Sequence, residues 1–337
     1  MAHVSIVLYP GIFQWLIDSV DQERAREYAR SILSSDQKRI GGIPNAVANF
    51  ADKNQKLVDR WFSQLGSFDP DPSNDITECI NSIETIGMRE KDKIQWMMNS
   101  GEIYEWLSTS KSCTLEVTAE TAPENIMNSI TITSALLCKT LVSATSFPVL
   151  AFFCGIRTND APSEQANSRA LLKSLNGQLL RFIQKCRPTI DLSFLSEKDY
   201  AQKALFKRLL HLFPKGDAVF ITIDSFSRIS GSNDDAKKLL ETLCKSFAEV
   251  PDLTIKLLVT DTLSNCSVKR WANSSLHVPD FVEGDRDGIN IDFVKKESKL
   301  AIQEFKVGKE DGKEVADIDT TSEEGTSSDF DSEVAGW

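Results

Sequence analysis

Hydrophobic patterning predicts strands that alternate with helices from about residue 113 onward. Continuous apolar runs of five to eight residues, bounded by turn-forming residues, are typical of strands buried on both faces. The expected strands span 113–118, 147–154, 218–223, 255–260 and, more briefly, 276–278. Between the strands, apolar residues recur every three or four positions, which is the helical period. The expected helices span 126–141, 163–186, 200–213 and 234–247.

Strands that alternate with helices need crossover connections, and such connections produce a parallel sheet covered by helices. The sequence therefore predicts a three-layer α/β domain over residues 113–295. Residues 76–112 are expected to form a helical lead-in to that domain.

The chain before residue 76 has helical periodicity without strand signals. Apolar residues at helical spacing predict helices over 24–33 and 47–65, separated by a Gly-Gly-Ile-Pro break at 41–44. Residues 68–75 contain two prolines, three aspartates and an asparagine, which favours a turn or linker. We therefore expect a helical N-terminal region over 1–75. Those helices are interpreted either as a homotypic interaction module or as packing for the α/β domain.

Charge is concentrated at the C-terminal end of the chain. The net charge of the 337 residues is −11, and residues 309–337 hold ten acidic and two basic residues, so the first 308 residues carry only −3. A nearly neutral body argues against binding nucleic acid through bulk electrostatics. The segment 296–337 is expected to be a short helix or linker followed by an acidic tail. The tail has few large apolar residues, so we expect it to be disordered.

Cysteine and histidine usage suggests a reduced compartment. The seven cysteines form no C-x-x-C pair, and several lie in apolar runs, so buried free thiols are expected. The three histidines are far apart, which gives no support for a metal site. The apolar N-terminal stretch lacks a basic region before it and is broken by Pro10 and Gly11, so neither a signal peptide nor a membrane span is expected. These features favour a cytoplasmic protein with no membrane partner.

In a parallel α/β sheet, ligands bind beyond the carboxyl ends of the strands. Here the loop after the first expected strand runs from Ala119 to Ile126, and the strand over 218–223 is followed directly by Asp224. An aspartate after an apolar strand is typical of a Mg²⁺-associated carboxylate, although such a residue also commonly caps a strand end.

Five segments in register carry a resemblance to a known family. Residues 79–90 resemble a "C-L-x-S-L…M-x-x-R" segment, 96–107 a "W-L-L…Y-x-x-W-L" segment, and 152–175 an "F-F-C…N-S-x-x-x-L-L-R-x-L" segment. Residues 219–224 match a Walker B strand, and 256–260 match the strand after it. Over residues 76–295 the chain resembles the fungal STAND proteins, which are NACHT-type signalling ATPases with a nephrocystin-like NTPase domain. The resemblance implies a P-loop NTPase fold, ATP or GTP with magnesium as ligand, and regulated protein partners.

The chain departs from the family pattern where nucleotide chemistry is needed. Aligned without gaps, the phosphate loop has Ala119 and Glu124 at the glycine positions, Asn125 at the lysine and Ile126 at the Ser/Thr. A P-loop needs the glycines for backbone contacts, the lysine for phosphate charge and the hydroxyl for Mg²⁺. The residues that follow Asp224 include no carboxylate, and Thr260-Asp261-Thr262 lacks the arginine that the family has there.

We therefore interpret the chain as a pseudo-NTPase without catalytic residues, bound metal or required cofactor. Its relict nucleotide site would comprise Ala119, Thr121, Asn125 and Asp224. Such a protein would act as an interaction or signalling scaffold, with protein partners that include full-length STAND relatives.

Two alternatives remain open at this stage. The chain is a nucleotide-binding NTPase if a lysine from elsewhere, such as Lys111 or Lys139, reaches the phosphates. It is an unrelated hydrolase if Ser225 or Ser227 is a nucleophile, although neither lies in a G-x-S-x-G elbow.

Overall fold

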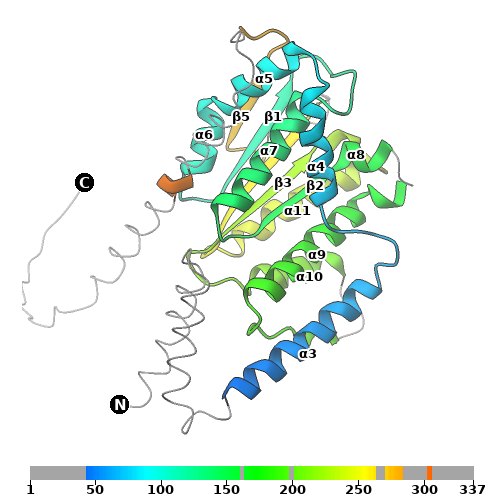
Figure 1. Ribbon diagram of the computed structural model, residues 1–337, viewed down its shortest axis with the longest axis vertical. Coiled ribbons are helices and arrows are strands. Elements are labelled where there is room, and N and C mark those ends of the chain that lie inside the picture. Colours follow the sequence, from blue (N-terminus) through cyan, green and yellow to red (C-terminus); the bar gives the residue numbers. More distant parts are fainter. Residues whose placement is uncertain (1–42, 160–162, 197–200, 263–269, 284–301, 306–337) are drawn as a thin grey trace, which may run out of the picture.

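A computed structural model of the chain describes residues 43–159, 163–196, 201–262, 270–283 and 302–305 (Figure 1). The fold is α/β, built on a five-stranded sheet in the order β2-β3-β4-β1-β5. Every strand pair is parallel, which confirms the predicted parallel sheet. The strands are β1 (Cys113–Ala119), β2 (Val149–Phe153), β3 (Ala218–Asp224), β4 (Thr254–Asp261) and β5 (Ser274–Val278).

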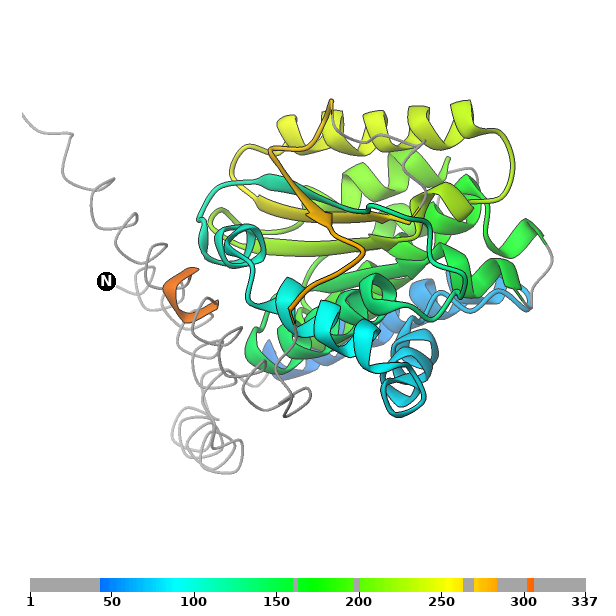
Figure 2. The same ribbon diagram turned by 90° about the horizontal axis from the view of Figure 1, so that it is seen from above.

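Helices contribute to separate hydrophobic clusters on the two faces of the sheet. The helices are α3 (Ile43–Ser63), α4 (Ser73–Asn81), α5 (Met88–Met98), α6 (Gly101–Ser108), α7 (Ser129–Ala144), α8 (Cys154–Asn159), α9 (Ser168–Cys186), α10 (Gln202–Leu210) and α11 (Asn233–Ala248). Helix α11 lies across the sheet from α4 and α5 when the molecule is viewed from above (Figure 2).

Alternation along each strand sends neighbouring side chains into different clusters. On β3, Val219 and Ile221 join the cluster that contains α3, α9, α10 and α11, whereas Phe220 joins the cluster that contains α5, α6 and α7. Both sets are buried because both faces are covered, so the strands are the continuous apolar runs expected for a parallel sheet.

The predicted helix boundaries differ from the observed ones in explainable ways. Cys154, expected at the end of a strand, begins α8. Helix α9 begins at Ser168 rather than 163, because the Asn167 side chain accepts a hydrogen bond from the Ala170 backbone N–H at 2.9 Å and so caps the helix. Helix α7 begins three residues later than expected, at Ser129, for the same reason: Asn128 caps it.

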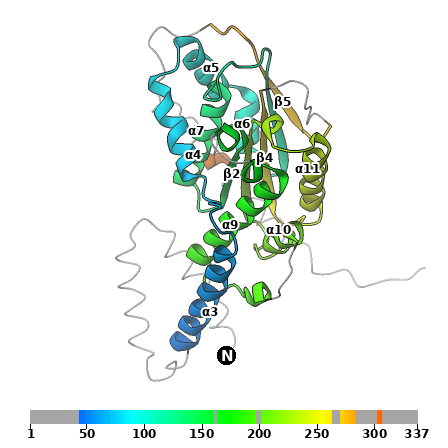
Figure 3. The same ribbon diagram turned by 90° about the vertical axis from the view of Figure 1, so that its right-hand side faces the viewer.

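Helix α7 is buried on nearly all sides. It packs on β2 and β3, and α4 and α5 cover its outer face, an arrangement seen edge-on in Figure 3. Twelve of its sixteen residues are buried. Its sequence is therefore apolar almost all round rather than amphipathic, and the short polar residues that it does carry face the sheet or its own backbone.

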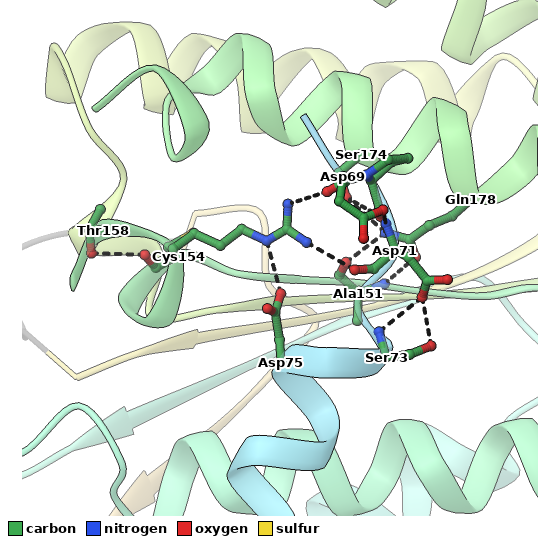
Figure 4. Close-up of polar contacts among 11 residues, drawn as sticks. Asp69, Asp71, Ser73, Asp75, Ala151, Cys154, Thr158, Ser174 and Gln178 are labelled. Carbon is green, nitrogen blue, oxygen red and sulfur yellow. Dashed lines mark hydrogen bonds and ion pairs between the residues drawn. The ribbon is translucent and has the colours of Figure 1, made fainter. Parts of the chain in front are cut away.

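Residues 68–75, expected to be a turn or linker, are held against the α/β body. The Pro70 carbonyl accepts hydrogen bonds from Ser174 Oγ at 2.8 Å and Gln178 Nε2 at 3.1 Å. Gly177 leaves the room for this contact, since a Cβ there would lie 2.6 Å from the Pro70 ring. Gln178 also pairs with both the N–H and the C=O of Ala151 on edge strand β2, each at 2.8 Å (Figure 4).

Arg157 secures the other end of the same segment. Its guanidinium donates to the carboxylate of Asp75 at 2.9 Å and to the backbone carbonyls of Asp69 and Asp71 at 3.0 and 3.2 Å (Figure 4). Upstream of the segment, Val58 and Trp61 of α3 pack in the same cluster as α9. Helix α3 is thereby fixed to the α/β body by both apolar and polar contacts.

Several sequence predictions fall outside the described residues. These are the helix over 24–33, the rest of the region before Ile43, and the disordered acidic tail. The boundaries at 75, 112 and 295 stay predictions. Six cysteines lie in the described part and are free thiols, three of them buried, as expected. No helix among the described residues is long and apolar enough to cross a membrane.

Candidate functional site

Asp224 lies at the carboxyl end of β3, where the sequence placed a Mg²⁺-associated carboxylate, but its side chain is fully buried. Four hydroxyl groups surround it. Thr260 Oγ1 donates to Oδ1 at 2.7 Å and Ser134 Oγ to the same oxygen at 3.3 Å. Thr131 Oγ1 and Ser225 Oγ each donate to Oδ2 at 3.0 Å. We call this group the Asp224 cradle.

The cradle satisfies both carboxylate oxygens from within the protein. An ionised carboxylate offers about four lone-pair sites. Three hydroxyl donors bond it here, and the single proton of Ser134 is shared between Asp224 and the Ile130 carbonyl, 3.1 Å away. Burial raises the pKa of Asp224, and the hydrogen bonds from the four hydroxyls oppose that rise. A Mg²⁺-associated carboxylate must leave an oxygen accessible to the ion or to its bound water. In this structure both oxygens of the Asp224 carboxylate are bonded by hydroxyl groups of the protein itself.

Ser225 adopts a backbone conformation that supports the cradle. Its φ is +52°, in the left-handed region that non-glycine residues rarely occupy. The turn places its backbone N–H 3.0 Å from Thr260 Oγ1, which accepts from Ser225 while donating to Asp224. The strain of this conformation is offset by a closed set of hydrogen bonds between the ends of β3 and β4.

The N-terminus of α7 is the second half of a potential phosphate site. Free N–H groups at a helix N-terminus, together with the helix dipole, bind anions. Here the Asn128 carboxamide accepts from the N–H groups of Ile130 and Thr131 at 3.0 and 3.2 Å. The Glu90 carboxylate on α5 accepts from the N–H of Ser129 at 2.7 Å. The first three N–H groups of the helix are therefore already bonded, one of them to a negative charge.

The loop before α7 packs against the backbone that follows β2. Ile126 is half-buried, and its Cγ2 lies 3.3 Å from where a Cβ on Gly155 would stand. Ser225 and Arg228 contact the same point. An apolar side chain thus lies beside the backbone that follows β2 and β3, at the carboxyl edge of the sheet.

Of the four predicted site residues, only Asp224 belongs to the Asp224 cradle. Ala119 ends β1, and Thr121 donates to the Asp280 carboxylate at 2.5 Å. Asn125 is exposed, and its carbonyl accepts from the Asn128 side chain. Within the described residues, none of these three hydrogen-bonds to Asp224.

The first hydroxyl of α7 that bonds Asp224 belongs to Thr131, whereas the gapless alignment put Ile126 at the Ser/Thr position. The offset is five residues, because the loop between β1 and α7 is longer than the alignment assumed and α7 starts at Ser129. If Thr131 is aligned with the Ser/Thr of the P-loop pattern, Ile130 stands at the lysine position. That position therefore carries no positive charge in this alignment either.

The two lysines considered as substitutes lie elsewhere. Lys111 is exposed and precedes β1, at the amino edge of the sheet. Lys139 is exposed on α7, eight residues beyond Thr131, which is about 12 Å along the helix.

The two serines considered as nucleophiles both lie just after the end of β3. Ser225 donates to Asp224, and Ser227 Oγ is a buried hydroxyl with no hydrogen-bond partner in the described part. His277, one of the two described histidines, is hydrogen-bonded to Thr118.

Sequence reasoning missed Glu90, Asn128, Thr131, Ser134 and Thr260 as site residues. The signal for Asn128 was available, since asparagine before an apolar helical run is a preferred N-cap. Glu90 comes from a separate helix, and only the fold brings it to α7. No group of three or more His, Cys, Asp or Glu that could hold a metal ion occurs in the part of the chain that the structure describes.

Comparison of the chain with protein-family models and with curated proteins finds no match.

Proposed function

We propose that the protein is a non-catalytic member of the P-loop NTPase fold class, a pseudo-NTPase that acts as an interaction or signalling scaffold related to fungal STAND proteins. The strand order supports the fold class, since β1 is an interior strand, between β4 and edge strand β5. The pairing of Thr131 with Asp224 supports it as well, because a P-loop hydroxyl and a Walker B carboxylate would meet at that point.

The observation that carries the non-catalytic part is the bonded N-terminus of α7. Polyphosphate binding would require Asn128 and Glu90 to release three backbone N–H groups. The phosphate would also meet the Glu90 carboxylate, whose charge is offset by the Lys93 ammonium at 3.5 Å and by no lysine at the start of α7. Each side-chain oxygen that lost its N–H partner would cost about 1–3 kcal/mol if it stayed unpaired. This cost would reduce the free energy gained on binding a nucleotide.

Thermal unfolding of the purified full chain with magnesium and ATP or GTP tests this proposal. A ligand at 100 times its Kd stabilises the native state by about 2.7 kcal/mol and raises Tm by a few degrees. We expect no rise in Tm with millimolar nucleotide and no phosphate release above a buffer blank. A reproducible rise of several degrees, or magnesium-dependent hydrolysis lost in Asp224→Ala, would instead support the nucleotide-binding alternative.

The scaffold part needs a separate measurement. The full chain is mixed at micromolar concentration with a full-length fungal STAND protein that has an intact P-loop, and the molar mass is followed by light scattering after size exclusion. We expect a complex of the two chains whose formation needs no nucleotide on this chain. Two separate peaks at all mixing ratios would count against such partners while leaving the nucleotide result unaffected.

A further inference from the structure

A buried lysine lies near the amino edge of the sheet, at the opposite end from the cradle. Lys256 is the third residue of β4, and its side chain is fully buried. The ammonium donates to the backbone carbonyl of Trp106 at 2.8 Å and to that of Thr109, both at the C-terminal end of α6. It also lies 5.3 Å from the centre of the Phe305 ring.

Its remaining partner is a thiol. Cys113, the first residue of β1, is the direct cross-strand neighbour of Lys256 in the parallel register. The Lys256 Nζ lies 3.5 Å from Cys113 Sγ, and the ammonium donates to the sulfur. The two side chains are thus held in contact by strand pairing, which leaves them little freedom to separate.

Cys113 and Lys256 differ in how deeply they are buried. Cys113 is half-buried, and it follows exposed Ser112 at the start of the strand. Lys256 is fully buried, with its ammonium between the end of α6 and the Phe305 ring.

We propose that Cys113 and Lys256 form an oxidative modification site, in which a peroxide converts the pair into a covalent sulfur–nitrogen crosslink. In the first step hydrogen peroxide transfers one oxygen to the thiol, which becomes a sulfenic acid, and the peroxide leaves as water. Sulfenic acids condense with a nearby thiol or nitrogen. In the second step the neutral Lys256 amine attacks the sulfur, the S–O bond breaks, and the oxygen leaves as water with the proton lost from nitrogen. Sulfur and nitrogen each lose one hydrogen overall, and one peroxide is reduced to two waters.

The electrostatics of the pair support the second step. Burial lowers the pKa of Lys256 to about 8, so a substantial share of the amine is neutral and nucleophilic near pH 8. Burial raises the pKa of the Cys113 thiol, and the Lys256 ammonium opposes that rise. Glu105 is the other charged group that acts on both, and it favours the protonated form of each. The crosslink should therefore form faster as pH rises from 7 through 8.

The crosslink would have a structural consequence. It removes the ammonium that bonds the Trp106 and Thr109 carbonyls and that lies over Phe305. The end of α6 and residues 302–305 would lose a shared cation, so peroxide would loosen the amino edge of the sheet and leave the Asp224 cradle unchanged.

Peptide mass spectrometry of the full chain treated with hydrogen peroxide tests the proposal. Free thiols are alkylated afterwards and the digest is kept non-reducing. We expect a crosslinked pair of peptides that contain Cys113 and Lys256, lighter by two hydrogens than their sum and separated by dithiothreitol. Cys113 found only as sulfenic, sulfinic or sulfonic acid, as a disulfide or as the free thiol would overturn the proposal.

A trapping experiment distinguishes the two steps. Dimedone added with the peroxide competes with Lys256 for the sulfenic acid. In the wild-type chain we expect little dimedone on Cys113. In Lys256→Arg, which keeps the charge but lacks a nucleophilic amine, we expect severalfold more dimedone on Cys113.

Cys244 on α11, also half-buried, is the internal comparison and should take up equal dimedone in both chains. Equal labelling of Cys113 in the two chains would contradict capture by Lys256. Because the crosslink itself is measured in the wild-type chain, the test does not depend on the variant folding.

Discussion

Two of the buried ionisable side chains on the central strands, Asp224 and Lys256, are stabilised in different ways at opposite edges of the sheet. Asp224 ends β3 and is held by four side-chain hydroxyls, whereas Lys256 lies near the start of neighbouring β4 and is held by two backbone carbonyls and a thiol. The hydroxyls bond both oxygens of the Asp224 carboxylate, and we call this edge of the sheet the closed edge. At the opposite edge the Lys256 amine lies 3.5 Å from the Cys113 sulfur.

Removing the acceptor at the closed edge should give the largest effect. Asp224→Ala would leave four hydroxyls without their common acceptor and open a small cavity, and disrupting a buried charged network of this kind costs about 3–5 kcal/mol. The free energy of unfolding from urea titration measures the loss. Asp252→Ala, at an exposed carboxylate paired with Lys215, is the matched control and should change it by less than about 0.5 kcal/mol. A loss in Asp224→Ala no larger than in the control would mean that the cradle does not stabilise the fold.

Titrating the lysine at the other edge should give an intermediate effect. The pKa of Lys256 is about 8 in the folded chain, against about 10.4 when unfolded. Between these values the unfolded chain binds more protons, so the free energy of unfolding should rise with pH, by on the order of 2 kcal/mol.

Cys113 must be removed to see this effect alone, because its raised pKa acts in the opposite direction at alkaline pH. We therefore compare Cys113→Ser with Cys113→Ser/Lys256→Met by urea titration from pH 7.5 to 10. The single variant should gain stability relative to the double variant across that range. Parallel pH profiles would show that Lys256 has an ordinary pKa in the folded chain.

The helix cap at the closed edge should give the smallest effect. Asn128→Ala frees the N–H groups of Ile130 and Thr131 and should cost about 1 kcal/mol. Asn167→Ala removes the matching cap from α9, a helix outside the expected phosphate loop, and should cost a similar amount. If inorganic phosphate restored Tm in Asn128→Ala but not in Asn167→Ala, the α7 terminus would still be competent to bind an anion once its own side chain is removed.

The strands could be predicted because a parallel sheet covered on both faces requires continuous apolar runs, such as the one that becomes β3. The position of β1 between β4 and β5 could not, since strand order depends on long-range pairing. Asp224 was visible as a carboxylate after a strand. Its partners were not, because Thr131 and Ser134 are ordinary helix residues until the fold turns them toward β3. A single lysine within the apolar run of β4 was a readable sign that Lys256 is buried, but its pairing with Cys113 depends on the strand register.

The contact between Pro70 and α9 also determines how mechanical force would pass through the molecule. A pull on α3 reaches Pro70, whose carbonyl is bonded to Ser174 and Gln178, and Gln178 continues the path into β2 through both polar groups of Ala151. Gly177 lets Pro70 approach α9 this closely, since a Cβ there would lie 2.6 Å from the Pro70 ring. Tension applied at the N-terminal side of the fold would therefore act on the edge of the sheet directly, without first extending a slack linker.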